Sequence, residues 1–347
     1  MINGHGDDLH LFGDISMNFS SNIFAHADLA PVMSHLAAHL DVIAHYPEPE
    51  ARSLEAKIAS QRDVSPEEVV VTNGAVDAIY TIADACRRLS LDAHHIVQPT
   101  FAEYEDACRA AQLPVSQLTE LDVADGAFAG QGRLSTRHAL WLCNPNNPTG
   151  NVLSVDTLVS LAQTFRLMVI DQSYADYTTM PSLDAAKVVE LGNVVSIHSM
   201  TKSCAIPGLR LGYVVAAAPL ANLIRSRLRP WTVNALAIEA GHYMLDHHFH
   251  AVPALQPYLE EAQRLRRMLL ALPHIDVLPT STNFMLCHIA THTAAQLKTH
   301  LATREGMLIR DASNFKTLTP HHFRIAAQLP HENDALVAAI KRLVEKD

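Results

Sequence analysis

Lys202 and Arg210 lie eight residues apart in the stretch "SIHSMTKSCAIPGLRLGYVV", which otherwise consists largely of apolar and small residues. A lysine in such a desolvated setting has a lowered pKa, and its neutral amine can bond covalently to a carbonyl carbon. The planar guanidinium of an arginine can hold a phosphate with two hydrogen bonds, and Ser199 and Thr201 supply hydroxyls beside it. The stretch therefore predicts a site that captures an aldehyde next to a phosphate.

A second strand end could bind the same anion. In "VVVTNGAVDAIY" an apolar run predicts a strand, and a helix follows at once. The backbone amides of Gly74, Ala75 and Val76 would then point out of the helix start, where the helix dipole favours negative charge. A plain strand-to-helix turn explains the same pattern, so both interpretations stay open at this point.

Two further strand ends carry polar side chains. "LCNPNNPTGNVLS" predicts a rigid turn that presents Asn147, and "VIDQSYADY" places Asp171 at the end of an apolar run with Tyr174 three residues later. A carboxylate at that position is buried and needs a partner. Ligands of open α/β sheets bind at the carboxyl ends of strands. A phosphate site, a reactive lysine and a buried carboxylate are together what pyridoxal 5'-phosphate requires.

Short β-branched runs alternate with helical patterns through the middle of the chain, as in "HHIVQP", "AEYEDACRAAQ", "HALWLCNP" and "VDTLVSLAQTF". This alternation predicts an α/β fold with a mostly parallel, doubly wound sheet in a large domain over residues 45–235. Residues 236–347 are expected to form a small α+β domain, and residues 1–44 an N-terminal arm and part of the small domain. One long helical stretch is expected over 235–272, and further helices from Thr293 and near the C-terminus.

Composition excludes several classes of function. The net charge of −10 without a Lys/Arg cluster argues against nucleic acid as a partner, and no apolar run is long enough to span a membrane. Five cysteines without a CxxC pair predict a cytoplasmic protein. No metal site is expected among the 21 histidines, because the neighbouring histidines of "LDHHFH" and "TPHHF" would point to different faces of a helix.

The order of these residues along the chain resembles the fold-type I pyridoxal-phosphate aminotransferases of class I/II over nearly the whole length. The residues that carry the resemblance are Asn147, Asp171, Tyr174, Ser199, Lys202, Arg210 and Arg324. The resemblance implies that Lys202, Asp171 and Tyr174 are catalytic: Lys202 bonds to the cofactor aldehyde, and Asp171 pairs with the ring nitrogen. Asn147 and Tyr174 would bond the ring oxygen. Taken singly, each residue also has an ordinary structural explanation.

The resemblance also implies the remaining contacts. Phe101 would stack on the cofactor ring, with Tyr104 the weaker candidate. Ser199, Thr201, Arg210 and the amides of residues 74–76 would hold the cofactor phosphate. Tyr46 would reach the phosphate of a second subunit, which makes a homodimer the expectation. The substrate would meet Arg324 through its carboxylate, and Arg310, Asn147 and His5 through its other polar groups.

Two arginines in one pocket favour a phosphorylated amino acid or amine as the substrate. "GHGDDLHLFGDISMNFSSNI" resembles the start of the threonine-phosphate decarboxylases of cobalamin biosynthesis, although Asp7-Asp8, Asn18 and "FAHADLAP" depart from their pattern. We therefore expect an L-threonine O-3-phosphate decarboxylase. The alternatives are a histidinol-phosphate or related aminotransferase and, more remotely, a noncatalytic sensor of the same fold.

Overall fold

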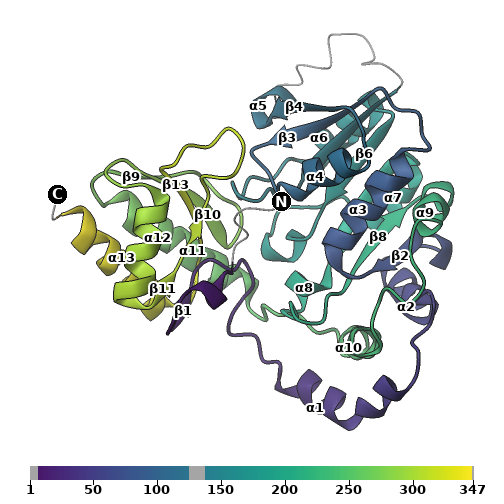
Figure 1. The fold of residues 1–347 in the computed structure, drawn as a ribbon, viewed down its shortest axis with the longest axis horizontal. Helices are drawn as coiled ribbons and strands as arrows, with labels where there is room; N and C mark the ends of the chain where they lie inside the picture. Colours follow the sequence, from purple (N-terminus) through teal and green to yellow (C-terminus); the bar gives the residue numbers. More distant parts are fainter. Residues whose placement is uncertain (1–6, 125–136, 346–347) are drawn as a thin grey trace.

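The computed structural model describes residues 7–124 and 137–345 of the chain. They form a larger and a smaller lobe, with the N-terminal segment passing between them (Figure 1). In the described part of the chain, no helix combines the length and the apolar character needed to cross a membrane.

The larger lobe is built on a seven-stranded sheet. The strands follow the spatial order β2 (Val69–Thr72), β8 (Gly212–Ala216), β7 (Val194–Ser199), β6 (Leu167–Asp171), β5 (His138–Cys143), β3 (Ala93–Gln98), β4 (Val115–Thr119). Six of these strands run in the same direction, and β8 runs in the opposite one. The predicted mostly parallel sheet is therefore confirmed.

Helices cover both faces of this sheet, which is why its central strands are apolar throughout. Trp141 of β5 packs into the core on one face, while Leu140 and Leu142 pack into the core on the other. The first face is covered by α3 (Gly74–Cys86), α4 (Glu103–Ala110) and α9 (Ala218–Arg225), and the second by α2 (Arg52–Arg62), α6 (Val155–Thr164), α7 (Ala185–Leu191) and α10 (Ala235–Asp246). Two short helices, α5 (Glu120–Ala124) and α8 (Met200–Ser203), follow β4 and β7. The doubly wound arrangement is confirmed.

The smaller lobe contains an antiparallel sheet in the order β12 (Arg310–Asp311), β13 (His322–Ala326), β10 (Phe284–Ile289), β9 (Ile275–Val277). It packs with α11 (Leu255–Leu270), α12 (Ala294–Glu305) and α13 (Pro330–Val344). The hydroxyl of Thr293 caps α12, as its sequence predicts. The small α+β unit is confirmed, whereas the exact boundaries of the two domains stay a prediction.

The helical stretch expected over 235–272 is interrupted and forms two helices, α10 and α11. The chain leaves the helical path between α10 and α11, where Phe249 donates its backbone N–H to the carbonyl of Met244 and Ala251 donates to that of Ser203. Pro253 follows, and proline restricts the conformation of the residue before it away from the helix. The backbone N–H of Ala251 therefore bonds to Ser203, next to Lys202, and does not make a helical hydrogen bond.

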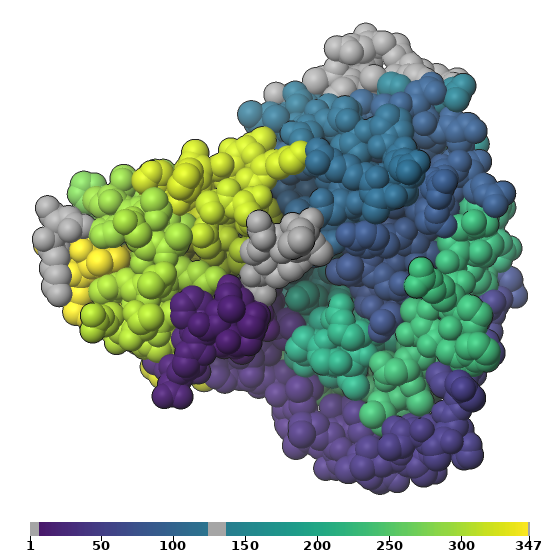
Figure 2. Space-filling model, viewed as in Figure 1, coloured from purple at the N-terminus to yellow at the C-terminus, as the bar shows by residue number. Residues whose placement is uncertain are grey.

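The N-terminal segment connects the two lobes. Its strand β1 (Met17–Asn18) pairs with β11 (Met307–Leu308) of the smaller lobe, and the carbonyl of Phe19 accepts the N–H of Ala326. Helix α1 (Ala30–Ala38) then packs on α10 of the larger lobe. Figure 2 shows this segment in purple, against the green C-terminal lobe and then along the base of the larger lobe. The described part of the chain also contains four 3-10 helices: Leu9–Leu11, Leu40–Ala44, Pro66–Glu68 and Ala175–Tyr177.

Gly212 of β8 allows the start of α3 to approach the sheet, so we predict that Gly212→Ala destabilises the protein. A Cβ at this position would lie 2.8 Å from the carbonyl oxygen of His198 and 2.9 Å from the amide nitrogen of Ala75. Overpacking against backbone that cannot yield costs about 1–3 kcal/mol. The free energy of unfolding in urea should fall by that amount.

Gly208→Ala is the matched control, because its Cβ would have no described atom within 4 Å. It should leave the free energy of unfolding unchanged or raise it by up to about 1 kcal/mol. Equal stabilities of the two variants would contradict the close-approach explanation.

Candidate active site

Strands β2, β5, β6 and β7 point their carboxyl ends to the same edge of the larger sheet, and a cavity of about 240 Å³ opens there. Residues of the N-terminal segment and of β13 complete its wall. Most side chains singled out in the sequence line this cavity: Ala75, Val76, Phe101, Asn147, Asp171, Tyr174, Ser199, Thr201, Lys202, Arg210 and Arg324. The structure therefore brings together residues that are up to 249 positions apart, from Ala75 to Arg324.

Lys202 lies on α8, directly after β7, and its amine sits 5.9 Å from the centre of the Tyr174 ring. Burial, together with the positive charges of Arg324 and Arg210, lowers the pKa of Lys202 to about 8. The carboxylates of Asp7 and Asp171 act in the opposite direction. A lysine with this pKa is neutral far more often near pH 7 than an exposed one, as a nucleophile toward a carbonyl must be.

Asp171 ends β6 at the base of the cavity. Its Oδ2 accepts a hydrogen bond from the hydroxyl of Tyr104 (2.8 Å), and its Oδ1 accepts one from the N–H of Ser173 (2.9 Å). Burial raises the pKa of Asp171, and these hydrogen bonds limit the rise because they favour the charged form. Tyr104 thus acts here as a partner of the carboxylate. The Phe101 ring lies edge-on to Tyr104 at 5.9 Å and lines the cavity beside it.

The anion-binding end of the cavity forms around the start of α3. Asn73 is the N-cap residue of α3, and its side chain makes no capping hydrogen bond among the described residues. Gly74 has a left-handed φ of 84°, and a Cβ there would lie 2.8 Å from a guanidinium nitrogen of Arg210. Arg210 donates to the carbonyl of Pro207 (3.1 Å) and to the hydroxyl of Thr201 (3.4 Å). Helix amides, a guanidinium and a hydroxyl therefore surround one point.

Arg324 crosses the cavity from β13 toward the larger lobe. Its guanidinium donates to the side-chain oxygen of Asn147 and to the carbonyl of Ser20 (2.6 Å). Burial lowers its pKa to about 10. Tyr174 stands nearby with its hydroxyl accepting a hydrogen bond from Asn22 (3.3 Å), and burial raises its pKa to about 12. The guanidinium of Arg324 is thus held by Asn147 and Ser20, and the same side chain lines the cavity.

Gly74 is not among the described lining residues, although its neighbours Ala75 and Val76 are. Three more distant predicted site residues are also not placed in the cavity wall by the structure. Arg310 is buried next to Arg324 in the sheet register, but its guanidinium donates to Asp311 and Asn314 and it is not among the described lining residues. Tyr46 is 87% exposed and contacts the Trp231 ring at 5.5 Å. His5 lies outside the described residues. The roles expected for these three stay predictions.

The N-terminal segment contributes lining residues that the sequence did not single out for the site. They are Asp7, Ser20, Ser21, Asn22 and Ile23, and Cys143, Ser173 and Pro207 join them from elsewhere. Asp7 and Asn18 had stood out as departures from the family's pattern, and the two contact each other: the amide of Asn18 donates to Oδ1 of Asp7. The two departures therefore form one local arrangement at the cavity mouth.

Comparisons with known proteins decide the family. The profile of the family described as "Aminotransferase class I and II" matches residues 14–340. The chain belongs to the aminotransferase class I and II family. Its members of fold type I use pyridoxal phosphate, which is therefore the cofactor of this aminotransferase-family chain.

Three relatives illustrate the range of the family. The crystal structure of L-threonine-O-3-phosphate decarboxylase from Porphyromonas gingivalis has a TM-score of 0.88 and 34% sequence identity, covering 95% of this chain and 99% of its own. A histidinol-phosphate aminotransferase of Roseiflexus castenholzii is 30% identical over 91% of this chain and 85% of its own. That of Sinorhizobium meliloti, solved with pyridoxal-5'-phosphate, shares the fold at a TM-score of 0.80 and 18% identity, covering 96% and 91%.

The residues of this aminotransferase-family site fit the cofactor. The uncapped start of α3 and the Arg210 guanidinium form a cradle for a phosphate. The guanidinium packs against Gly74, where a Cβ would come too close to it. The buried Asp171 carboxylate can hold a protonated ring nitrogen, and the Lys202 amine can reach an aldehyde between them. The roles of the individual residues remain proposals.

The lowered pKa of Lys202 predicts how the cofactor-free enzyme takes up pyridoxal phosphate. The neutral amine is the reactive form, so the rate of covalent incorporation should rise with pH and level off above a midpoint near about 8. The measurement is the amount of cofactor fixed to residue 202 by borohydride after short incubations across the pH range, with peptide mapping.

Asp7→Asn provides the matched variant, because the Asp7 carboxylate raises the pKa of Lys202. Removing that charge should move the midpoint to lower pH, and Lys202→Ala should fix no cofactor. A midpoint that stays near that of an exposed lysine in both proteins would contradict the electrostatic description of the site.

Proposed function

We propose that this chain is an L-threonine O-3-phosphate decarboxylase. The observation that carries the proposal is the position of the N-terminal segment: the part of the sequence that resembles these decarboxylases supplies residues 20–23 to the cavity wall. The 34% identity to the Porphyromonas gingivalis enzyme over 95% of the chain supports the same choice.

In this proposal the side chains divide the work around the substrate. Bound pyridoxal phosphate supplies an electron-withdrawing ring that accepts the electron pair of the bond broken at the α-carbon. Arg324 holds the α-carboxylate and fixes its direction, since a guanidinium bonds a carboxylate through two parallel hydrogen bonds. Asp171 keeps the ring nitrogen protonated. The Nζ of Lys202 delivers the proton that replaces CO2 at the α-carbon.

A histidinol-phosphate aminotransferase is the second candidate, and one observation favours it. The Asp7 carboxylate lines the cavity, where it would attract a protonated imidazole ring such as that of histidinol phosphate. The 30% identity to the Roseiflexus castenholzii enzyme is consistent with this candidate.

The two candidates predict different products. Holoenzyme given O-phospho-L-threonine should release CO2 and leave 1-aminopropan-2-yl phosphate, without any keto acid. Holoenzyme given histidinol phosphate and 2-oxoglutarate should form no glutamate. Carbon dioxide release and glutamate are measured on the same preparation, and the opposite pair of results would establish the aminotransferase instead.

Arg324→Ala serves as the site variant in this assay. Loss of the buried guanidinium should lower kcat/KM about a hundredfold or more, because breaking a buried charge pair costs about 3–5 kcal/mol. Arg137→Ala, a half-exposed arginine paired with Asp92, should leave kcat/KM unchanged.

We further propose a cytoplasmic homodimer in which Tyr46 of each subunit reaches the cofactor phosphate of the other. Support comes from the surface: Met33, Leu40, Ile43, Tyr46 and Trp231 are large apolar side chains that are 50–87% exposed. Exposed apolar side chains gathered in this way are typical of subunit interfaces. All five cysteines are buried and free, as expected in a reducing compartment.

A subunit-mixing experiment tests the role of Tyr46. Tyr46→Ala should retain pyridoxal phosphate weakly and Lys202→Ala should not bond it at all. In a refolded mixture, a hybrid dimer would contain one site with both Lys202 and Tyr46 intact, so tight covalent binding should return at a fraction of the sites. If mixing restores nothing, Tyr46 does not act across subunits.

A further inference from the structure

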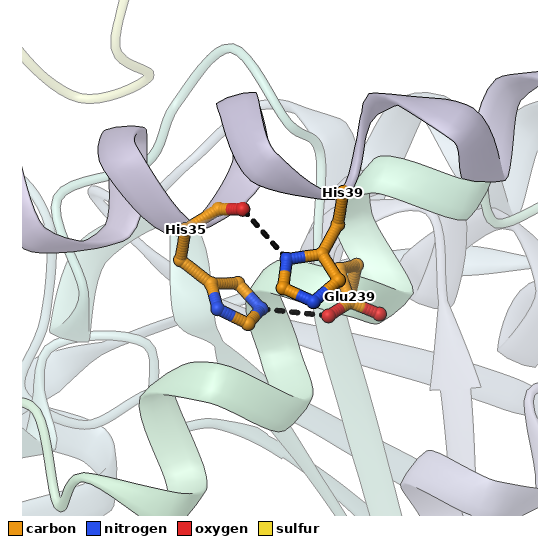
Figure 3. Close-up of side chains that lie close together, drawn as sticks. All are labelled: His35, His39 and Glu239. Carbon is orange, nitrogen blue, oxygen red and sulfur yellow. Dashed lines mark hydrogen bonds and ion pairs between the residues drawn. The ribbon is translucent and has the colours of Figure 1, made fainter.

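Three potential metal ligands converge where α1 packs on α10, away from the cavity. His35 lies on α1, His39 follows one helical turn later at its C-cap, and Glu239 lies on α10 (Figure 3). One ligand atom from each of the three lies within 4.8 Å of the other two. In the described part of the chain, no other group of three His, Cys, Asp or Glu side chains meets this criterion.

Hydrogen bonds already orient these side chains. The Nδ1 of His39 bonds to the backbone carbonyl of His35 at 2.8 Å, which requires a proton on Nδ1 and leaves Nε2 as the lone-pair nitrogen. Nε2 of His35 lies 2.6 Å from a carboxylate oxygen of Glu239. His39 is thus held through Nδ1 and keeps Nε2 available for a metal ion, as is typical of metal-ligating histidines, whereas His35 bonds Glu239 directly.

Ring packing holds His35 in place as well. Its ring lies between the ring of His39, at 4.1 Å, and that of Tyr243, at 4.4 Å. Tyr243 in turn stacks on His247 at 4.1 Å. The side chains of His35 and Glu239 are about three-quarters buried, so their positions are restricted by the packing of α1 on α10.

We propose that His35, His39 and Glu239 bind a divalent transition-metal ion, with Zn²⁺ the best fit. Two imidazoles and one carboxylate, with water in the fourth position, are a common tetrahedral zinc set. Zn–N bonds of about 2.0–2.1 Å place neighbouring donors roughly 3.3 Å apart, so the three side chains need only small rotations to close on the ion. Imidazole donors disfavour Mg²⁺ and Ca²⁺, which prefer oxygen ligands.

Another histidine cluster lacks this convergence. In the smaller lobe the ring of His288 lies 5.7 Å from that of His321 and 5.0 Å from that of His322. However, Nδ1 of His321 bonds to the carbonyls of Ile289 and His292, and Nδ1 of His322 accepts from the N–H of Thr319. The neighbouring histidines of the sequence predicted no metal site, because they would point to different faces of a helix. The pair one turn apart becomes a site only through Glu239, which is 200 positions beyond His39.

A bound ion would have a structural consequence. It would cross-link α1, the end of the N-terminal segment, to α10 of the larger lobe. Residues 20–23 of that same segment line the cavity. An ion that binds only the folded state stabilises the protein by an amount that grows with the logarithm of the metal concentration above Kd.

The test uses holoenzyme from which metals have been removed with a chelator. Titration with Zn²⁺ by calorimetry should show one ion bound per chain at this site, and the melting temperature should rise with Zn²⁺ concentration. Mg²⁺ and Ca²⁺ should do neither. Glu239→Gln keeps the shape of the side chain but removes its charge, and it should weaken this binding by at least about tenfold.

Variants with fewer histidines separate this site from others in a histidine-rich chain. The double variant His35→Ala, His39→Ala should lose the ion and the zinc-dependent rise in melting temperature. The matched variant His321→Ala, His322→Ala should retain both. Wild-type protein that binds no Zn²⁺, or equal binding by the two double variants and by Glu239→Gln, would overturn the proposal.

Discussion

Burial of the Lys202 amine beside two arginines is the constraint on which the rest of the site depends. The lowered pKa, about 8, leaves roughly a tenth of the amine neutral at pH 7, against less than a thousandth for an ordinary lysine. The positive charges of Arg324 and Arg210 contribute to this shift only because little water screens them. Removing either arginine would therefore change the chemistry of Lys202 as well as lose a contact to a ligand.

The topology of the large sheet brings these charges together. β2, β5, β6 and β7 run in one direction, so the residues that follow them meet at one edge although they are far apart in sequence. The antiparallel β8 lies between β2 and β7, and its Gly212 pairs with Thr72 on one side and with Ser199 on the other. The absence of a side chain there lets the start of α3 and the end of β7 lie close to each other.

Sequence patterns predicted the strand ends well, because a buried parallel strand followed by a polar residue is a local signal. Asp171, Asn147 and Lys202 were found in this way, and all three line the cavity. The wall formed by the N-terminal segment was not found, since it depends on contacts such as Ser20 with Arg324, which are 304 positions apart. The break between α10 and α11 was also missed, because a backbone hydrogen bond from Ala251 to the distant Ser203 determines it. Local periodicity carries no information on such pairings.

The charges of the described cavity wall show what the N-terminal segment adds. Lys202, Arg210 and Arg324 are cationic, and without that segment Asp171 alone would oppose them. Asp7 adds a second carboxylate, held by Asn18 and by a hydrogen bond from its own N–H to the hydroxyl of Ser20. Among its described residues the wall therefore carries three cationic and two acidic side chains. Because Asn18 lies in the strand β1 that anchors the segment to the smaller lobe, and Ser20 follows two residues later, the position of Asp7 depends on how this segment docks on that lobe.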